Sequence, residues 1–294
     1  MKVAIYGLYN TDKSKQPVEE LFGYLSHHKF EVVVEESFLN ALKQNANIKH
    51  SYKSFNGFYD LDNSFDVMIT IGGDGTILKA VTLVRDLNIP ILGINTGRLG
   101  FLATVQKTQI KEAIEALVQN NYSVKERELL SVKTNNDSSD FKGLNFALNE
   151  VAVNRKDSTA MIVINAYIDD EFLNSYWADG LIIATPTGST GYSLSCGGPI
   201  ITPSAKSLAV TPIAPHNLNV RPLVIPIHSK IKLKVSGRSN HFLISLDSRI
   251  ITVEKNTEIY IKTADFKLKM IYLENQTFIK TLRDKMLWGS DTRN

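Results

Sequence analysis

The chain has 294 residues, of which 43% are hydrophobic and 21% are charged, a composition typical of globular proteins. Its 33 basic and 30 acidic residues leave a formal net charge of +3, which gives no reason to expect a nucleic-acid or membrane partner. Cys196 is the single cysteine, so a disulfide within the chain is excluded and a reducing compartment fits.

The chain begins with "MKVAIYGLYN", whose apolar stretch is too short for a signal peptide and is typical of a first strand. No apolar run in the sequence reaches the ~18 residues of a membrane-spanning helix. Length and composition therefore predict a cytoplasmic protein of one or two domains, each able to bury a core.

The first 121 residues alternate strand and helix patterns. We expect strands at residues 3–6, 30–36, 66–71 and 91–95, and helices at residues 38–44, 76–88 and 108–120, with another helix opened by Pro17. Residues 44–63 are polar, lack periodicity and are expected to form a surface loop. This alternation predicts a Rossmann-like, doubly wound parallel sheet, in which ligands bind where strand C-termini meet helix N-termini.

From about residue 122 the pattern changes to short β-rich segments separated by turns such as "IDDEF" and "SGRSN". Residues 122–275 are therefore expected to form a mainly antiparallel β-sandwich domain. The tail, residues 276–294, has a helical pattern that places Phe278, Leu282 and Leu287 on one face, and we expect it to pack back on the first domain.

The segment "GGDGT" lies at the junction of an expected strand and an expected helix. Gly72, Gly73 and Gly75 allow close approach to the backbone, and a helix that begins near Thr76 would direct N–H groups at phosphate. The carboxylate of Asp74 is either a helix cap or a general base that takes a proton from an attacking hydroxyl in phosphoryl transfer.

The motif "LNEVAVNR" places Asn149 and Glu150 at the start of a strand. The pair is either a solvated strand end or a binding site for two adjacent ribose hydroxyls, because a carboxylate accepts hydrogen bonds and an amide both donates and accepts them.

The longest motif, "ADGLIIATPTGSTGYSLSCGGPI", is a loop of Gly, Ser and Thr that follows an apolar strand. Such a loop is either merely flexible or a place where a flat ligand approaches the backbone, with Tyr192 as a stacking face and Asp179 as a polar anchor. Its flanking apolar strands argue against a linker. We expect Cys196 to be a packed thiol, and His216, in "TPIAPHNLNV", to form structural hydrogen bonds more readily than to act in catalysis.

No motif for a metal cluster or a nucleophilic elbow is present, since the six histidines lack HExxH spacing and "GSTGYS" lacks the G-x-S-x-G pattern. Taken together, "GGDGT", "GINTGRLGFL", "LNEVAVNR", "DGLIIATPTGSTGYSLSCGGPI" and "PHNLNVRPLVIP" resemble, in this order, the motifs of the NAD kinase family. The resemblance is strong over about residues 67–224. "GGDGT" alone is shared with lipid kinases, and the long Gly/Ser/Thr loop with "NE" distinguishes the families.

The resemblance implies an enzyme that phosphorylates NAD with ATP, or with inorganic polyphosphate in some members, and a divalent metal such as Mg²⁺. It implies that Asp74 accepts the proton of the 2′-hydroxyl of the adenosine ribose. The other residues that it implies for NAD are Gly75, Lys79, Asn149, Glu150, Ala160, Trp177, Asp179, Thr190, Gly191, Tyr192, Ser193, Leu194 and Ser195. It implies Gly72, Gly73, Gly75 and Thr76 for the phosphates of ATP, and no protein side chain is assigned to the metal. Homodimers and homotetramers are usual in the family.

The sequence departs from the family pattern at several of these positions. Gly191 stands where alanine is common, Trp177 where many bacterial members have a smaller or basic residue, and Ala160 at a position that is often polar. "SLDSR" stands where "DGQ" is typical, so that Arg249 either replaces the contact of the family's glutamine or faces solvent. Two alternatives to an NAD kinase are a lipid or sugar kinase that shares "GGDGT" and a non-catalytic NAD(H)-sensing module.

Overall fold

The computed structural model describes residues 1–8, 11–46, 51–135, 141–156, 160–274 and 276–288. The chain divides into two compact units, of which unit 1 comprises Met1–Glu126 with Leu268–Asn294 and unit 2 comprises Arg127–Lys267. Residues 122–126 and 268–274, which the sequence suggested as parts of the β domain, thus belong to unit 1. None of the helices in these ranges is long and apolar enough to cross a membrane.

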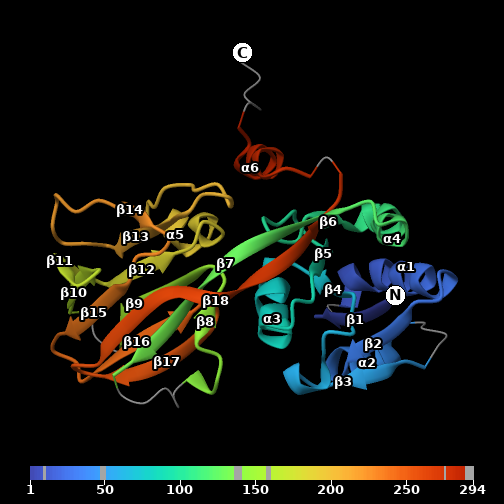
Figure 1. Ribbon diagram of the computed structural model, residues 1–294, viewed down its shortest axis with the longest axis horizontal. Coiled ribbons are helices and arrows are strands. Elements are labelled where there is room, and N and C mark those ends of the chain that lie inside the picture. Colours follow the sequence, from blue (N-terminus) through green and yellow to red (C-terminus); the bar gives the residue numbers. More distant parts are fainter. Residues whose placement is uncertain (9–10, 47–50, 136–140, 157–159, 275, 289–294) are drawn as a thin grey trace. The chain divides into compact units, whose positions relative to one another are not determined.

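Unit 1 is a parallel sheet with helices on its faces (Figure 1). Its strands lie in the order β3-β2-β1-β4-β5, and β6 and the end of β18 both pair with β5 in parallel. The elements are β1 (Lys2–Gly7), α1 (Thr11–His27), β2 (Glu31–Glu35), α2 (Glu36–Asn45), β3 (Lys53–Phe55), η1 (Phe58–Asp60), β4 (Val67–Gly72), α3 (Asp74–Val84), β5 (Ile91–Asn95), β6 (Val105–Gln106), η2 (Lys107–Gln109), α4 (Ile110–Gln119) and α6 (Phe278–Met286).

The two faces of this sheet are covered by different helices. Val3 and Ile5 of β1 pack in one hydrophobic cluster with α1, α2 and α4, and Figure 1 draws α1 beside α4. Helix α3 contacts β1, β4 and β5, and it approaches β5 so closely that a Cβ on Gly93 would lie 2.6 Å from Cδ1 of Ile77. The expected Rossmann-like arrangement is therefore confirmed, and α3 starts at the C-terminal end of β4, where such folds bind ligands.

Two expectations for unit 1 are wrong. Helix α1 begins at Thr11, so that Pro17 lies inside it and does not open it. Proline removes one helical hydrogen bond, and the complete burial of Val18, Leu21 and Leu25 offsets this loss.

The second wrong expectation concerns residues 44–63, which are not all surface loop. They contain β3 and η1, and β3 extends the sheet beside β2 with the ring of Phe55 buried. A three-residue strand is too short to show periodicity in the sequence. Residues 47–50 of this segment lie outside the described residues.

Unit 2 is built from antiparallel strands, as the sequence predicts, and they enclose a main hydrophobic core and a smaller cluster around Ile182. One sheet has the order β14-β13-β12-β9-β16-β17. The other strands follow the order β11-β10-β15-β18, with β7 paired with β18 and β8 paired with β7. The elements are β7 (Ser123–Thr134), β8 (Phe146–Ala147), β9 (Glu150–Arg155), β10 (Ile162–Ile168), β11 (Glu171–Ala178), β12 (Gly180–Ala184), η4 (Gly188–Thr190), α5 (Tyr192–Ser195), β13 (Ser207–Ile213), β14 (Leu223–Pro226), β15 (Ile231–Ser236), β16 (His241–Leu246), β17 (Arg249–Glu254) and β18 (Glu258–Tyr272).

The C-terminal helix α6 packs on unit 1, as the sequence predicts, but its buried face is shorter than expected. Leu282 is buried, whereas Leu287 caps the helix in a left-handed conformation with φ of 56° and is 72% exposed. The helix ends one residue before Leu287, so this side chain leaves the face on which an uninterrupted helix would place it.

Candidate functional site

The glycine turn of unit 1 joins β4 to α3. Gly72 has φ of +154°, and a Cβ at this position would lie 2.1 Å from Oγ1 of Thr76. Gly73 is the N-cap of α3, and Asp74 is the first residue of the helix. The N–H groups of the first turn of a helix have no acceptor within the helix, so this turn directs donors at whatever approaches it.

Asp74 does not cap α3, so the capping interpretation is wrong. Its carboxylate instead accepts hydrogen bonds from three backbone N–H groups of the loop that follows β5. The N–H of Phe101 donates to Oδ2 at 2.8 Å, and those of Leu102 and Ala103 both donate to Oδ1 at 3.0 Å. A carboxylate has about four acceptor positions. Two donors occupy Oδ1 and one occupies Oδ2. Among the described residues no further donor reaches Oδ2, so this oxygen can accept one more hydrogen bond from a ligand.

The loop that holds Asp74 is itself shaped by close contacts. Asn95, at the end of β5, accepts the N–H of Gly97 and donates to the carbonyl of Arg98, which closes the first turn of the loop. Gly100 is required because a Cβ there would lie 1.9 Å from Oδ1 of Asp74. The motif "GINTGRLGFL" therefore places a glycine where the carboxylate of Asp74 approaches the backbone.

The other residues that the sequence assigns to phosphate differ in exposure. The backbone of Gly73 and Gly75 is exposed, and a Cβ on either glycine would meet open space. Lys79, which the resemblance assigns to NAD, is exposed one helical turn beyond Gly75. Thr76, in contrast, is buried with its hydroxyl against Gly72, so that its side chain packs inside the turn and does not face a ligand.

In unit 2, Asn149 and Glu150 stand at the start of β9 and are held from two sides. The carbonyl of Asn149 accepts the N–H of Thr185 at 2.8 Å, which ties the pair to the end of β12. The buried carboxylate of Asp247 accepts the N–H groups of Leu148, Asn149 and Glu150 at 2.9, 2.7 and 3.3 Å. The pair is therefore not a solvated strand end.

Glu150 is an acid with a strongly raised pKa. Its side chain is buried, and its Oε2 is the buried side-chain atom for which the described residues provide no hydrogen-bond partner. Burial first, and then the charge of Asp247, raise the pKa of Glu150 to about 8, against a smaller effect of the Tyr192 N–H. This carboxyl therefore holds its proton at neutral pH and can both donate and accept a hydrogen bond.

The Gly/Ser/Thr loop packs directly on this pair. A Cβ on Gly188 would lie 2.0 Å from the carbonyl oxygen of Asn149, and one on Gly191 would lie 3.1 Å from Oε2 of Glu150. The hydroxyl of Ser189 bonds the backbone of Pro186 and Ile201. The loop is thus ordered by its own hydrogen bonds, and its small residues are needed because its backbone lies against Asn149 and Glu150.

Among the assigned residues 190–195, the side chains point in different directions. Tyr192 is 41% exposed and lines a cavity of about 360 Å³ with Glu150 and Asp247. Thr190 and Leu194 are half-buried and Ser195 is exposed. Ser193 is fully buried with its hydroxyl 2.9 Å from that of Thr211, so that it stabilises the loop and its side chain is not directed at a ligand.

Three assigned residues lie along β10–β12 and their connections. Asp179 pairs with Arg155, with 2.8 Å between Oδ1 and Nε, and both side chains are about one-third exposed. Trp177 is 51% exposed, and its carbonyl accepts the N–H of His216. Ala160 is half-buried ahead of β10.

Sequence reasoning missed Asp247 as the carboxylate that holds Asn149 and Glu150, and it left the role of Arg249 open. The guanidinium of Arg249 donates to the carbonyls of Leu144, at 2.5 Å, and Phe146, and its side chain is 26% exposed. The side chain of Arg249 therefore binds the backbone of the protein and does not face solvent. The departure "SLDSR" from "DGQ" was the signal that marked this hairpin as unusual.

In the part of the chain that the structure describes, no three His, Cys, Asp or Glu side chains gather where they can hold a metal ion. Mg²⁺ is commonly bound through substrate phosphates with one or two carboxylates, so a nucleotide can bring the ion with it.

Two family models match the chain. The ATP-NAD kinase N-terminal domain matches residues 3–122, and the ATP-NAD kinase C-terminal domain matches residues 148–273. A curated NAD kinase from Flavobacterium psychrophilum is 53% identical over 294 residues, which cover 100% of both chains.

Two solved structures have the same fold. An NAD kinase from Archaeoglobus fulgidus in complex with ATP is 26% identical, with a TM-score of 0.74 over 98% of this chain and 99% of the other. A yeast NADH kinase complexed with NADH is 23% identical, with a TM-score of 0.85 over 98% of this chain and 88% of the other.

Proposed function

The chain belongs to the ATP-NAD kinase family, and on this basis we propose that it transfers the γ-phosphoryl group of ATP to the 2′-hydroxyl of the adenosine ribose of NAD. The products are NADP and ADP. The observation that carries the proposal is the full-length similarity to curated NAD kinases. The geometry at Asp74 and at Glu150 supports it.

Asp74 is the proposed proton acceptor. The three backbone N–H groups fix the carboxylate and leave Oδ2 with one open acceptor position. In the reaction, the ribose hydroxyl would give its proton to this oxygen while its own oxygen bonds to the γ-phosphorus. The bond between the γ-phosphorus and the bridging oxygen breaks, and ADP leaves with that electron pair.

The first turn of α3 is proposed to bind the phosphates of ATP. Gly73 and Gly75 are exposed and have open space where a side chain would be, so phosphate oxygens can approach their N–H groups. Lys79 lies on the same helix and adds a cation. The Mg²⁺ that accompanies ATP neutralises phosphate charge when it is bound.

Asn149 and Glu150 are proposed to bind ribose hydroxyls of NAD. The pKa of about 8 keeps the carboxyl of Glu150 neutral at neutral pH, so that it offers both a donor and an acceptor. Its Oε2 lacks a partner among the described residues, and a hydroxyl would supply one. Tyr192 provides an exposed aromatic face beside this carboxyl.

The assignment of Asp74 is tested by replacing it with asparagine. Asp74→Asn cannot take the proton, and its amide cannot accept all three N–H groups, so we expect turnover to fall by about 10²–10⁴. Turnover is measured as NADP formed from NAD, ATP and Mg²⁺. Asp86→Asn, an exposed acid after the same helix, is the control and should keep wild-type turnover. Near-normal turnover of Asp74→Asn would refute the assignment.

The same assay on the wild-type chain tests the function itself. NADP formation supports an NAD kinase. Binding of NAD without product would identify a dinucleotide sensor, and phosphorylation of a lipid or sugar alcohol without NADP would identify another kinase that shares "GGDGT". Substituting polyphosphate for ATP, and NADH for NAD, defines the donor and acceptor range. The proposal places the enzyme in the cytoplasm as a homodimer or homotetramer. Light scattering of the purified protein measures its molar mass and so tests the number of subunits.

A further inference from the structure

The position of Asp74 depends on the loop that follows β5, because this loop supplies the three N–H groups that hold the carboxylate. Peptide groups place a carboxylate accurately only if their own loop is fixed. Asn95 closes the start of the loop within its own turn. The contacts that fix its far end come from a remote part of the chain.

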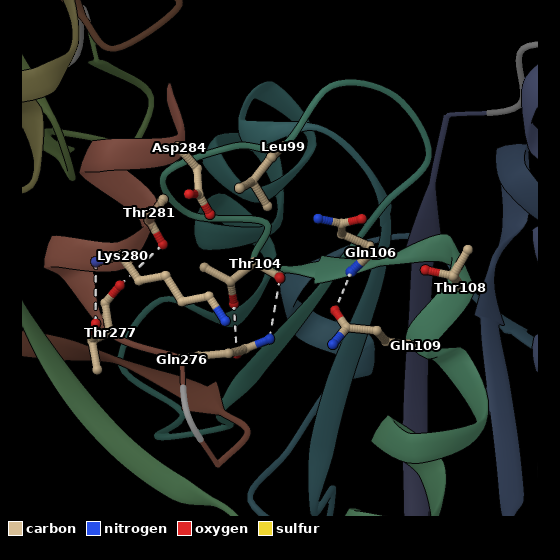
Figure 2. Close-up of a pocket in the computed structure, with 10 residues that line it drawn as sticks. All are labelled: Leu99, Thr104, Gln106, Thr108, Gln109, Gln276, Thr277, Lys280, Thr281 and Asp284. Atoms are coloured by element: carbon tan, nitrogen blue, oxygen red, sulfur yellow. Dashed lines mark hydrogen bonds between the residues drawn. The ribbon is translucent and has the colours of Figure 1, made fainter. Parts of the chain in front are cut away.

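Gln276 joins the C-terminal segment to Thr104, the residue after Ala103. Its Oε1 accepts the hydroxyl of Thr104 at 3.0 Å and the N–H of Leu273 at 3.1 Å, and its Nε2 donates to the carbonyl of Thr104 at 3.1 Å. Figure 2 shows the amide facing Thr104, with Lys280 of α6 on the same side of the pocket. One side chain therefore connects two segments that are 172 residues apart.

Helix α6 contacts the loop at two more places. The ring of Phe278 packs against that of Phe101, with 6.2 Å between ring centroids. The ammonium of Lys285 donates to the carbonyl of Leu99 at 2.8 Å and lies 5.1 Å from the centre of the Phe101 ring. Phe101 also supplies the N–H that reaches Oδ2 of Asp74, so α6 touches the residue nearest the open acceptor position.

We propose that the C-terminal segment, through Gln276, Phe278 and Lys285, positions Asp74 for proton transfer by fixing the loop that holds its carboxylate. These are positioning residues, since all their described contacts with Asp74 pass through the loop. The inference rests on the proposed function. It assigns to the end of the chain a role in the reaction rate that is separate from the binding of NAD in unit 2.

The expected signature is a loss in kcat with little change in KM. Loosening the loop displaces the carboxylate, and small displacements of a catalytic group are costly, so Gln276→Ala and Lys285→Met should each lower kcat about tenfold. The KM values for NAD and ATP should stay within about twofold, because uniform binding contacts are retained. Lys285→Arg, which keeps a donor for the carbonyl of Leu99, should recover most of the lost kcat.

Arg283→Met is the matched control, because Arg283 is an exposed cation of the same helix and is not one of the residues that line the pocket beside the loop. It should leave kcat unchanged. Lys285 is also exposed, so Lys285→Met does not remove buried packing and is expected to fold. Urea unfolding of each variant checks that any loss of kcat is not a loss of folded protein.

The decisive measurement is a double-mutant cycle with Asp74→Asn. If Gln276 acts through the carboxylate, Gln276→Ala lowers kcat about tenfold in the wild-type background and has no further effect on Asp74→Asn. An equal loss in both backgrounds, or no loss in either, would overturn the inference. A wild-type protein that forms no NADP would instead refute the proposed function, so the two failures are distinguishable.

Discussion

Two carboxyl groups of this protein, Asp74 and Glu150, have opposite surroundings. Asp74 is held by three backbone N–H groups, which stabilise a charged acceptor. Glu150 is buried beside Asp247, lacks a partner for Oε2 among the described residues, and has its pKa raised to about 8. These surroundings suit the proposed roles, in which Asp74 accepts a proton and the neutral carboxyl of Glu150 binds a hydroxyl.

The raised pKa of Glu150 predicts a pH dependence of stability. The pKa of this carboxyl is near its ordinary value of 4.5 in the unfolded chain and about 8 in the folded protein. Between pH 4.5 and about pH 8 the folded state binds more protons than the unfolded state. The stabilisation from this group is therefore complete below the unfolded pKa, and it is lost as the pH rises through the folded pKa. The slope is about 1.4 kcal/mol per pH unit.

Glu150→Gln removes this ionisation while it keeps the shape of the side chain. From about pH 5.5 to about pH 7.5, the wild type should therefore lose about 2–3 kcal/mol more free energy of unfolding than the variant. Urea unfolding at both pH values measures this difference. Glu254→Gln, an exposed acid on β17, should behave as the wild type. Equal slopes for the wild type and Glu150→Gln would contradict the raised pKa.

Among the secondary-structure elements, the hairpin of β16 and β17 holds the backbone at the start of β9 in place. Its turn carries Asp247, which accepts the N–H groups around Asn149. Arg249, the first residue of β17, donates to the carbonyls of Leu144 and Phe146. Arg249 also packs over the ring of Phe146. The hairpin therefore supports β8 and β9 from one side, and we expect Arg249 to be structural.

Arg249→Met leaves the two carbonyls without their charged donor and keeps an apolar stem. We expect the free energy of unfolding to fall by about 1–3 kcal/mol, the usual effect of unmaking hydrogen bonds to a charged group. Urea unfolding measures the change. Arg238→Met, at an exposed arginine before β16, should be within about 0.5 kcal/mol of the wild type. An unchanged stability of Arg249→Met would show that solvent replaces these bonds.

At the scale of the whole molecule, the chain has separate hydrophobic cores in its two units. Leu21 is completely buried in the cluster of unit 1, and Leu181 is completely buried in the cluster of unit 2. The two clusters share no residue. A cavity made in one core is therefore not expected to change the packing of the other core directly.

Leu21→Ala and Leu181→Ala should each lower the free energy of unfolding by about 2–5 kcal/mol, through lost burial and the cavity that remains. Their effects should add within about 0.5 kcal/mol in the double variant, as for sites without shared partners. Val118→Ala, at a 45% exposed valine of α4, is the control and should change little. Urea unfolding of the four proteins measures additivity, and a coupling above about 1 kcal/mol would contradict independent cores.

Local patterns in the sequence were enough to predict the features that depend on neighbouring residues. Glycines at 72, 73 and 75 mark the turn before α3, alternating apolar patterns mark the strands, and the order of motifs identifies the family. These patterns failed where a local rule was outweighed by packing, as at Pro17, or where an element was too short to show a period, as at β3.

Which groups meet across long separations in the chain depends on how the whole chain folds. The N–H groups that hold Asp74 lie 27–29 residues away, Asp247 reaches Asn149 over 98 residues, and Gln276 reaches Thr104 over 172. Each of these three side chains binds a backbone N–H or C=O group, which every residue except proline carries in full, so no pattern of residue types predicts the partner. Residue types reveal which chemistry is available, and the path of the folded backbone decides where it is held.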